Sequence, residues 1–139
     1  MSDTDMTPIL THMGVLKMLT AGVAKAEEIG QPQCIVIVDA SGETLGEIRM
    51  TGSKFLSRRS ALAKALTSAS HNISSDTIPE HVRPAVAAAT DGAVTGLGGG
   101  LPVRVGAALV GGIGVGSGSP DQELQDALAA LAAIGADPV

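Results

Sequence analysis

Aromatic side chains are almost absent from this 139-residue sequence, which contains no tryptophan, no tyrosine and a single phenylalanine, Phe55. Small aliphatic side chains must fill the core instead, and they let backbones approach closely but add little bulk. Cysteine is equally scarce, because Cys34 stands alone in the apolar segment "CIVIV". It cannot form an intrachain disulfide and is expected to be a buried, reduced thiol, which favours the cytoplasm. We expect a thin, closely packed domain that forms homo-oligomers.

Basic clusters and long apolar runs are also lacking. The formal net charge is −5 and Arg58-Arg59 is the one basic cluster, which argues against nucleic acid as a partner. No apolar run reaches the ~18 residues of a membrane span, and the acidic start "MSDTDMTP" does not resemble a secretory signal. The sequence predicts a cytoplasmic protein without membrane contact, built as one domain over residues 1–139 with a flexible N-terminus at 1–7.

Capping signals and periodicity predict three main helices. The first is expected to start at Thr7-Pro8, the second at Ser53 with its end near His71, and the last at Ser119-Pro120 as a capping box. A short helix is predicted over 84–89. The stripes expected to pack are Ile9, Met13, Leu16, Thr20, Val23 and Ala26 in the first helix, Leu56, Ser60, Ala63, Leu66 or Thr67, and Ser70 in the second, and Leu124, Ala127 or Leu128, Leu131 and Ile134 in the last.

A β-hairpin is predicted between the first two helices. The segment "QCIVIVDASGETLGEIRM" indicates strands near 33–39 and 44–50. The first strand is apolar throughout, which is typical of a central strand covered on both faces. Strands joined by short turns between helices favour an α+β layer architecture with an antiparallel sheet.

Glycine is the residue in excess, and eleven of the eighteen glycines lie between Gly92 and Gly118. The absence of a "GK[ST]" sequence excludes a phosphate loop, and "GGIGVG" is followed by more strand-like residues where a dinucleotide fingerprint needs a helix. Interleaved β-forming residues argue against a flexible linker and predict two strands, near 101–105 and 107–116. The glycines then either admit a closely packed helix or leave a bare sheet face for a ligand.

Three segments carry a resemblance to a known family: "VDASGETLGEIRMTG", "SALAKALTSA" and "GGGLPVRVGAALVGGIGVGSGSPDQELQDA". In order and spacing they resemble the GlcG/HbpS family of small haem-binding-like proteins, which also includes the C-terminal domain of PduO-type cobalamin adenosyltransferases. The resemblance covers residues 9–135. It implies a profilin-like α/β/α sandwich with a central antiparallel sheet of about five strands, usually assembled into oligomers, and haem, a corrinoid or another tetrapyrrole as a possible ligand.

Most of the candidate site residues are at positions that match the family, while Arg59 and His71 are chosen for their own chemistry. Arg49 and Lys64 are two cations expected near the glycine strands, where arginine grips carboxylates and lysine serves as a point charge, acid or base. His71 lies seven residues after Lys64, on nearly the same helical face, and is a candidate proton shuttle or, with haem bound, an iron ligand. Glu123 is a candidate general base. The expected ligand-binding residues are Arg49, Arg59, Lys64, Thr67, Gly99 and Gly100.

Two functions of different classes follow from these residues. The first is a small-ligand-binding protein that holds haem, another tetrapyrrole or a small anionic organic molecule between the glycine strands and the helix bearing Lys64. The second is a cofactor-free catabolic enzyme, such as a tautomerase, isomerase or hydratase, that uses Lys64 or Glu123 on a small carboxylic acid. An isomerase or lyase is favoured over an oxidoreductase, and a scaffolding oligomer without ligand is a third reading.

Overall fold

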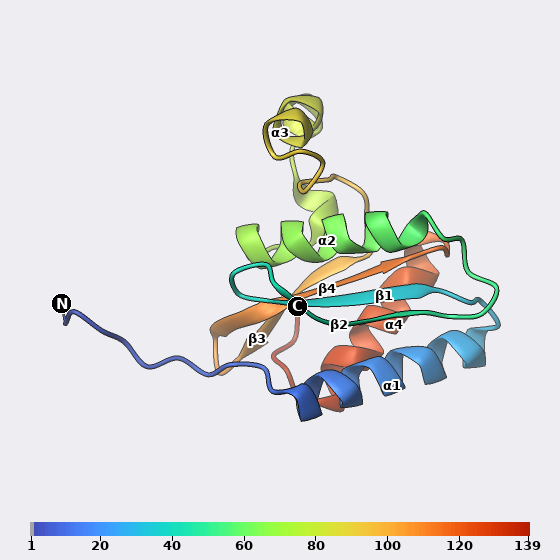
Figure 1. Ribbon diagram of the computed structural model, residues 1–139, viewed down its shortest axis with the longest axis horizontal. Helices are drawn as coiled ribbons and strands as arrows, with labels where there is room; N and C mark the ends of the chain where they lie inside the picture. Colours follow the sequence, from blue (N-terminus) through green and yellow to red (C-terminus); the bar gives the residue numbers. More distant parts are fainter. Residues whose placement is uncertain (1) are drawn as a thin grey trace.

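A four-stranded antiparallel sheet lies between two helical layers in the computed structural model, which describes residues 2–139 (Figure 1). The elements are α1 (His12–Ile29), β1 (Cys34–Asp39), β2 (Thr44–Arg49), α2 (Ser57–His71), the 3₁₀ turns η1 (Ser75–Thr77) and η2 (Glu80–Val82), α3 (Arg83–Ala89), β3 (Gly100–Val105), β4 (Ala108–Gly116) and α4 (Pro120–Ala133). The strand order is β2-β1-β4-β3. The predicted α+β sandwich is confirmed, with four strands instead of about five.

The two helical layers divide the core. Helices α1 and α4 cover one face of the sheet and α2 covers the other, while α3 stands beyond α2 and away from the sheet (Figure 1). Ile35 and Ile37 of β1 pack in the cluster on the α1 and α4 side, and Cys34, Val36 and Val38 pack with α2. All five side chains are fully buried, so β1 is the central strand that its unbroken apolar run predicts.

Only one of the three predicted helix starts is confirmed. Thr11, not Thr7, caps α1, and Leu56 precedes α2 without a side-chain cap. Ser53 is not the predicted cap, because α2 begins four residues later, at Ser57. The Ser53 hydroxyl donates instead to the carbonyl oxygen of Met50. The capping box at Ser119 is present. Among residues 2–139, no helix has both the length and the apolar character needed to cross a membrane.

The buried faces of α1 and α4 agree only in part with the predicted stripes. Met13 and Leu16 of α1 are about half exposed, and so are Leu124 and Leu128 of α4 to a smaller extent. The buried residues are Val15, Met18, Gly22 and Ala26 in α1 and Glu123, Asp126, Ala127, Ala130 and Leu131 in α4. Of these, only Ala26, Ala127 and Leu131 belong to the predicted stripes. Helix α4 thus turns two acids inward and two leucines outward.

Helix α2 lies directly on the glycines of β4. A Cβ at Gly114 would overlap the carbonyl oxygen of Ala61, and a Cβ at Gly116 would lie 2.7 Å from the carbonyl oxygen of Ser57. Two strand residues span about 6.8 Å and four helical residues about 6 Å, so alternate glycines meet successive turns of the helix. The glycines therefore admit a helix, and the backbone of α2 fills the space predicted to hold a ligand.

Candidate functional site

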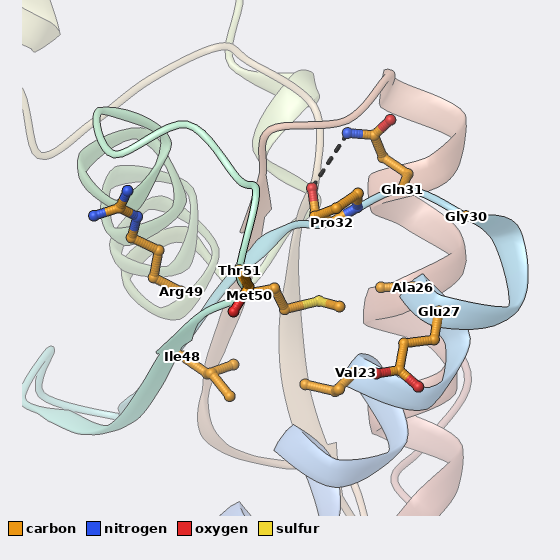
Figure 2. A pocket seen from close by; sticks show the side chains of 10 residues that line it. All are labelled: Val23, Ala26, Glu27, Gly30, Gln31, Pro32, Ile48, Arg49, Met50 and Thr51. Carbon is orange, nitrogen blue, oxygen red and sulfur yellow. Dashed lines mark hydrogen bonds between the residues drawn. The ribbon is translucent and has the colours of Figure 1, made fainter.

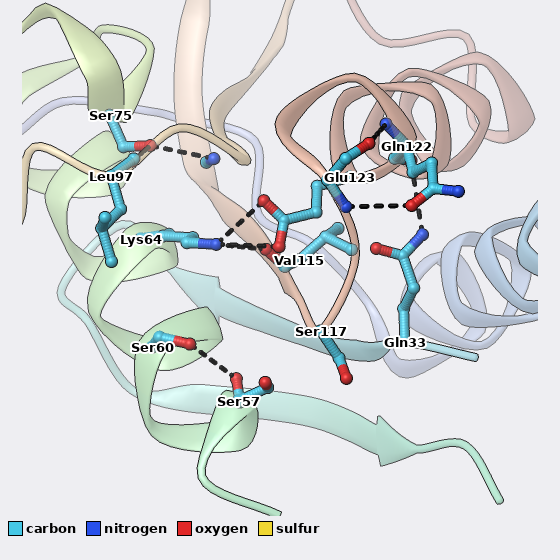
Figure 3. A network of polar contacts seen from close by, with 12 residues as sticks. Gln33, Ser57, Ser60, Lys64, Ser75, Leu97, Val115, Ser117, Gln122 and Glu123 are labelled. Carbon is cyan, nitrogen blue, oxygen red and sulfur yellow. Dashed lines mark hydrogen bonds and ion pairs between the residues drawn. The ribbon is translucent and has the colours of Figure 1, made fainter. Parts of the chain in front are cut away.

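Lys64 and Glu123 form a buried ion pair that joins α2 to α4 (Figure 3). The Lys64 Nζ donates to the two Glu123 carboxylate oxygens, at 3.1 and 3.2 Å, and to the carbonyl oxygen of Val115 at 2.8 Å. All three ammonium hydrogens thus have acceptors. The side chains are 5% and 6% exposed. Burial raises the pKa of Glu123, and the positive charge of Lys64 partly offsets that rise.

Gly99 and Gly100 pack against this ion pair. Gly99 has a φ of 109°, and a Cβ there would lie 2.9 Å from the Glu123 Oε1 and 2.7 Å from the carbonyl oxygen of Val115. A Cβ at Gly100 would lie 2.5 Å from the carbonyl oxygen of Lys64. The structure therefore brings four predicted site residues together, in a closed arrangement where the glycines make room for Lys64 and Glu123.

Thr67 and His71 lie on the following turns of α2. The buried Thr67 hydroxyl lies 2.7 Å from the carbonyl oxygen of Ala63 and accepts a hydrogen bond from the Thr95 amide at 3.0 Å, which ties the loop before β3 to the helix. His71 is exposed at the end of α2, with Nδ1 3.2 Å from the Thr67 carbonyl oxygen. A ring that donates there through Nδ1 leaves Nε2 as the nitrogen able to bind iron or a proton.

Two adjoining grooves follow the outer side of α2 and share Leu66 and Ala93. The larger is about 460 Å³ and combines apolar residues with the hydroxyls of Ser41, Ser70 and Thr90. The smaller is about 360 Å³, and its lining residues are Arg59, Leu62, Ala63, Leu66, Asp91, Gly92 and Ala93. Part of the stripe that the sequence predicts to pack, Ala63, Leu66 and Ser70, instead lines these grooves.

A third groove, of about 500 Å³, lies between the end of α1 and β2 (Figure 2). Val23, Ile48 and Met50 point into it, and Glu27 lies at its rim (Figure 2). The guanidinium of Arg49 points away, because neighbouring strand residues point to opposite faces of a sheet (Figure 2). Arg49 lies on the α2 side of the edge strand β2, where it is exposed and forms none of the ion pairs found within residues 2–139. It therefore does not take the predicted place beside Lys64.

Sequence reasoning missed a second buried acid, Asp126, and its partner Gln33. Asp126 lies three residues after Glu123 and therefore on the same side of α4. This spacing is the one feature of the sequence from which its burial beside Glu123 could have been predicted. Within residues 2–139 no group of three histidine, cysteine or carboxylate side chains is arranged to hold a metal ion.

Comparison with known proteins identifies the family. Residues 10–134 match the family described as haem degrading protein HbpS-like. The chain belongs to the HbpS-like family. The Klebsiella pneumoniae protein ORFY, of family DUF336, has a solved structure that matches with 26% identity and a TM-score of 0.90 over 97% of both chains. The resemblance to GlcG/HbpS proteins is thereby confirmed.

Two further relatives of this HbpS-like chain connect it to PduO. A solved PduOC–haem complex is 27% identical, with a TM-score of 0.86 over 94% of this chain and 98% of that one. The corrinoid adenosyltransferase PduO of Salmonella typhimurium is 31% identical over 134 residues, which is 92% of this chain and 40% of PduO. The HbpS-like chain thus spans about two fifths of the length of this curated relative.

Proposed function

We propose that this HbpS-like protein binds haem or a related tetrapyrrole in the two adjoining grooves on the outer side of α2. The observation that carries the proposal is the PduOC–haem complex, whose fold matches 94% of this chain. The family description names haem as well. The relationship to a corrinoid adenosyltransferase makes a corrinoid the second tetrapyrrole to test.

The grooves suit such a ligand in size and chemistry. Their volumes, about 460 and 360 Å³, fall within the range of roughly 300 to 1,000 Å³ that is typical of ligand sites. Leu62, Leu66 and Val94 offer apolar surface on which a flat macrocycle can lie, in place of the aromatic walls that the composition excludes. Arg59 at the edge supplies the planar cation that pairs best with a propionate.

His71 is the candidate for iron ligation. It follows Ser70, which lines the larger groove, although His71 is not itself among the residues lining that groove. When bound, haem would supply an iron centre that can take an imidazole nitrogen as a ligand. In this chain His71 would offer Nε2, with Nδ1 held toward the Thr67 carbonyl.

Arg59→Ala is expected to weaken haem binding about tenfold, the loss of roughly 1.4 kcal/mol that one solvent-facing charge-assisted hydrogen bond provides. The measurement is a haem titration followed by the Soret band. Arg58→Ala is the matched control, because Arg58 belongs to the same turn but pairs with Glu47 outside the grooves. It is expected to bind haem as the wild type does.

Filling the grooves gives a second arm to this titration. Ala93→Trp places a large ring where both grooves meet and is expected to abolish the saturable Soret shift. His71→Ala is expected to retain binding with an altered axial-ligand spectrum. A wild-type protein without a saturable shift, or a shift that Ala93→Trp leaves intact, would contradict the proposed site.

The raised pKa of Glu123 favours a second candidate, the cofactor-free enzyme with Lys64 or Glu123 as acid or base. Both side chains are closed off from solvent, so a substrate would reach them only after α2 or the loop before β3 moved. The test is proton exchange into enolisable carboxylic acids. Exchange that Glu123→Gln does not slow, in a variant shown to be folded, would rule this function out.

We also propose that a homo-oligomer covers the exposed leucines of α4. Leu124→Glu combined with Leu128→Glu is expected to reduce the assembly to single chains of 13.8 kDa. Burying the exposed 39% and 43% of the two leucines contributes roughly 0.6–1.2 kcal/mol each, and a glutamate in their place adds the cost of burying a charge. Light scattering measures the mass. Ala132→Glu, at another exposed position of α4, is the control for added charge. A wild-type mass of one chain would overturn this assignment.

A further inference from the structure

Gln33, the residue before β1, forms a buried polar pair with Asp126 of α4. Both residues are fully buried. The Gln33 Nε2 donates to the Asp126 Oδ2 at 2.6 Å and to the carbonyl oxygen of Gln122 at 3.3 Å. Figure 3 shows the Gln33 amide turned toward α4, beside the Lys64–Glu123 ion pair. The pair lies outside the three grooves and belongs to no function proposed above.

Two atoms of this pair have no partner, the Gln33 Oε1 and the Asp126 Oδ1. With Asp126 ionised, both atoms can only accept a hydrogen bond, so neither can satisfy the other. A buried acceptor without a donor costs about 1–3 kcal/mol, and a buried charge costs more. The ionised form therefore leaves two unfavourable groups in the interior.

The charged groups that face Asp126 do not compensate for a negative charge. Lys25 of α1 acts on it from a distance, but its ammonium is paired with Glu28 at 3.2 Å and is partly exposed. Glu123 lies one turn away on the same helix and carries a like charge. The Lys64 hydrogens are all used by Glu123 and Val115. Strand β4 contributes no titratable side chain.

We propose that Asp126 retains a proton in the folded protein and forms with Gln33 a neutral acid–amide pair that links α4 to the residue before β1. A proton on Oδ1 supplies the donor that the Gln33 Oε1 lacks, while the Gln33 Nε2 donates to Oδ2. Both unpartnered atoms are then satisfied. The three buried side chains Lys64, Glu123 and Asp126 then have a net charge of zero, because the charges of Lys64 and Glu123 cancel and Asp126 is neutral.

This hydrogen-bonded pair is lost as the pH rises, because Asp126 then releases its proton. Burial raises the pKa of Asp126 from 3.8 to about 7, against the opposing effects of the Gln33 hydrogen bond and the Lys25 charge. Between these values the folded protein holds a proton that the unfolded chain has released, so stability falls as the pH increases. The stabilisation is complete near pH 4 and lost above pH 7.

The experiment compares chemical unfolding of the wild type and Asp126→Asn from pH 5 to pH 8. Asparagine keeps the shape of the neutral acid, and its N–H can donate where the acid donates its O–H. Relative to the variant, the wild-type unfolding constant is expected to rise about tenfold per pH unit between pH 5 and 7. Asp121→Asn removes an exposed acid from the same helix and should follow the wild-type profile.

A carbon-13 NMR titration of the Asp126 carboxyl in the wild type decides the matter independently, including the case in which Asp126→Asn does not fold. The expected midpoint is about 7. A midpoint near the ordinary 3.8, or unfolding profiles of wild type and Asp126→Asn that run parallel, would overturn the proposal. Asp126 would then be ionised, with an internal water donating to the two acceptors.

Discussion

Gly114→Ala is expected to destabilise the protein by about 3 kcal/mol or more, at the upper end of what overpacking costs. The added Cβ would overlap the carbonyl oxygen of Ala61 and lie 2.6 Å from the amide nitrogen of Ala65. Both atoms belong to the backbone of α2 and cannot rotate away as a side chain would. Relief requires the whole helix to move off the sheet. Urea unfolding measures the loss directly.

Gly98→Ala is the matched control for this substitution. A Cβ at Gly98 would meet the Asp76 Cβ at 3.8 Å, which is ordinary contact, so the expected change is within about 0.5 kcal/mol. If both variants were equally stable, α2 would not press on β4. The glycine face of β4 would then have room for a ligand, as the sequence-based prediction of a pocket between the glycine strands and α2 requires.

Local patterns predicted most of the elements because periodicity and turn residues act over a few neighbours. The contact of α2 with β4 depends on two patterns that lie far apart in the sequence. The alternate glycines of β4 face small residues that recur at every fourth position of α2. That second pattern, Ser57, Ala61, Ala65 and Ala69, is present in the sequence. Hydrophobicity could not choose between it and the stripe through Ala63 and Leu66, since both contain small or apolar residues.

Four of the predicted site residues lie together in the structure, but their burial was not predicted. Resemblance to a family selected Lys64, Gly99 and Gly100, and the structure places all three together with Glu123. Acids in the first turn of a helix normally face water, where they complement the helix dipole, so nothing local predicts that Glu123 is buried. Its burial follows from the cation that α2 places opposite, 59 residues away in the chain.

Lys64→Met is expected to cost about 3–5 kcal/mol of folding stability, because removing one partner of a buried ion pair leaves the other charge uncompensated. The variant also deprives the Val115 carbonyl of its donor. Without the cation, the pKa of Glu123 loses an influence that lowers it, so burial raises that pKa further. The measurement is urea unfolding at pH 7 and at pH 5.

The pH dependence and a double variant separate a structural ion pair from a catalytic one. A carboxyl with a raised pKa favours the folded state while protonated, so Lys64→Met should recover stability relative to the wild type as the pH falls toward 5. Lys64→Met combined with Glu123→Leu removes both charges and should recover most of the loss. A Lys64→Met variant as stable as the wild type at both pH values would refute the structural role. The pair would then be retained for chemistry, as the enzyme proposal requires.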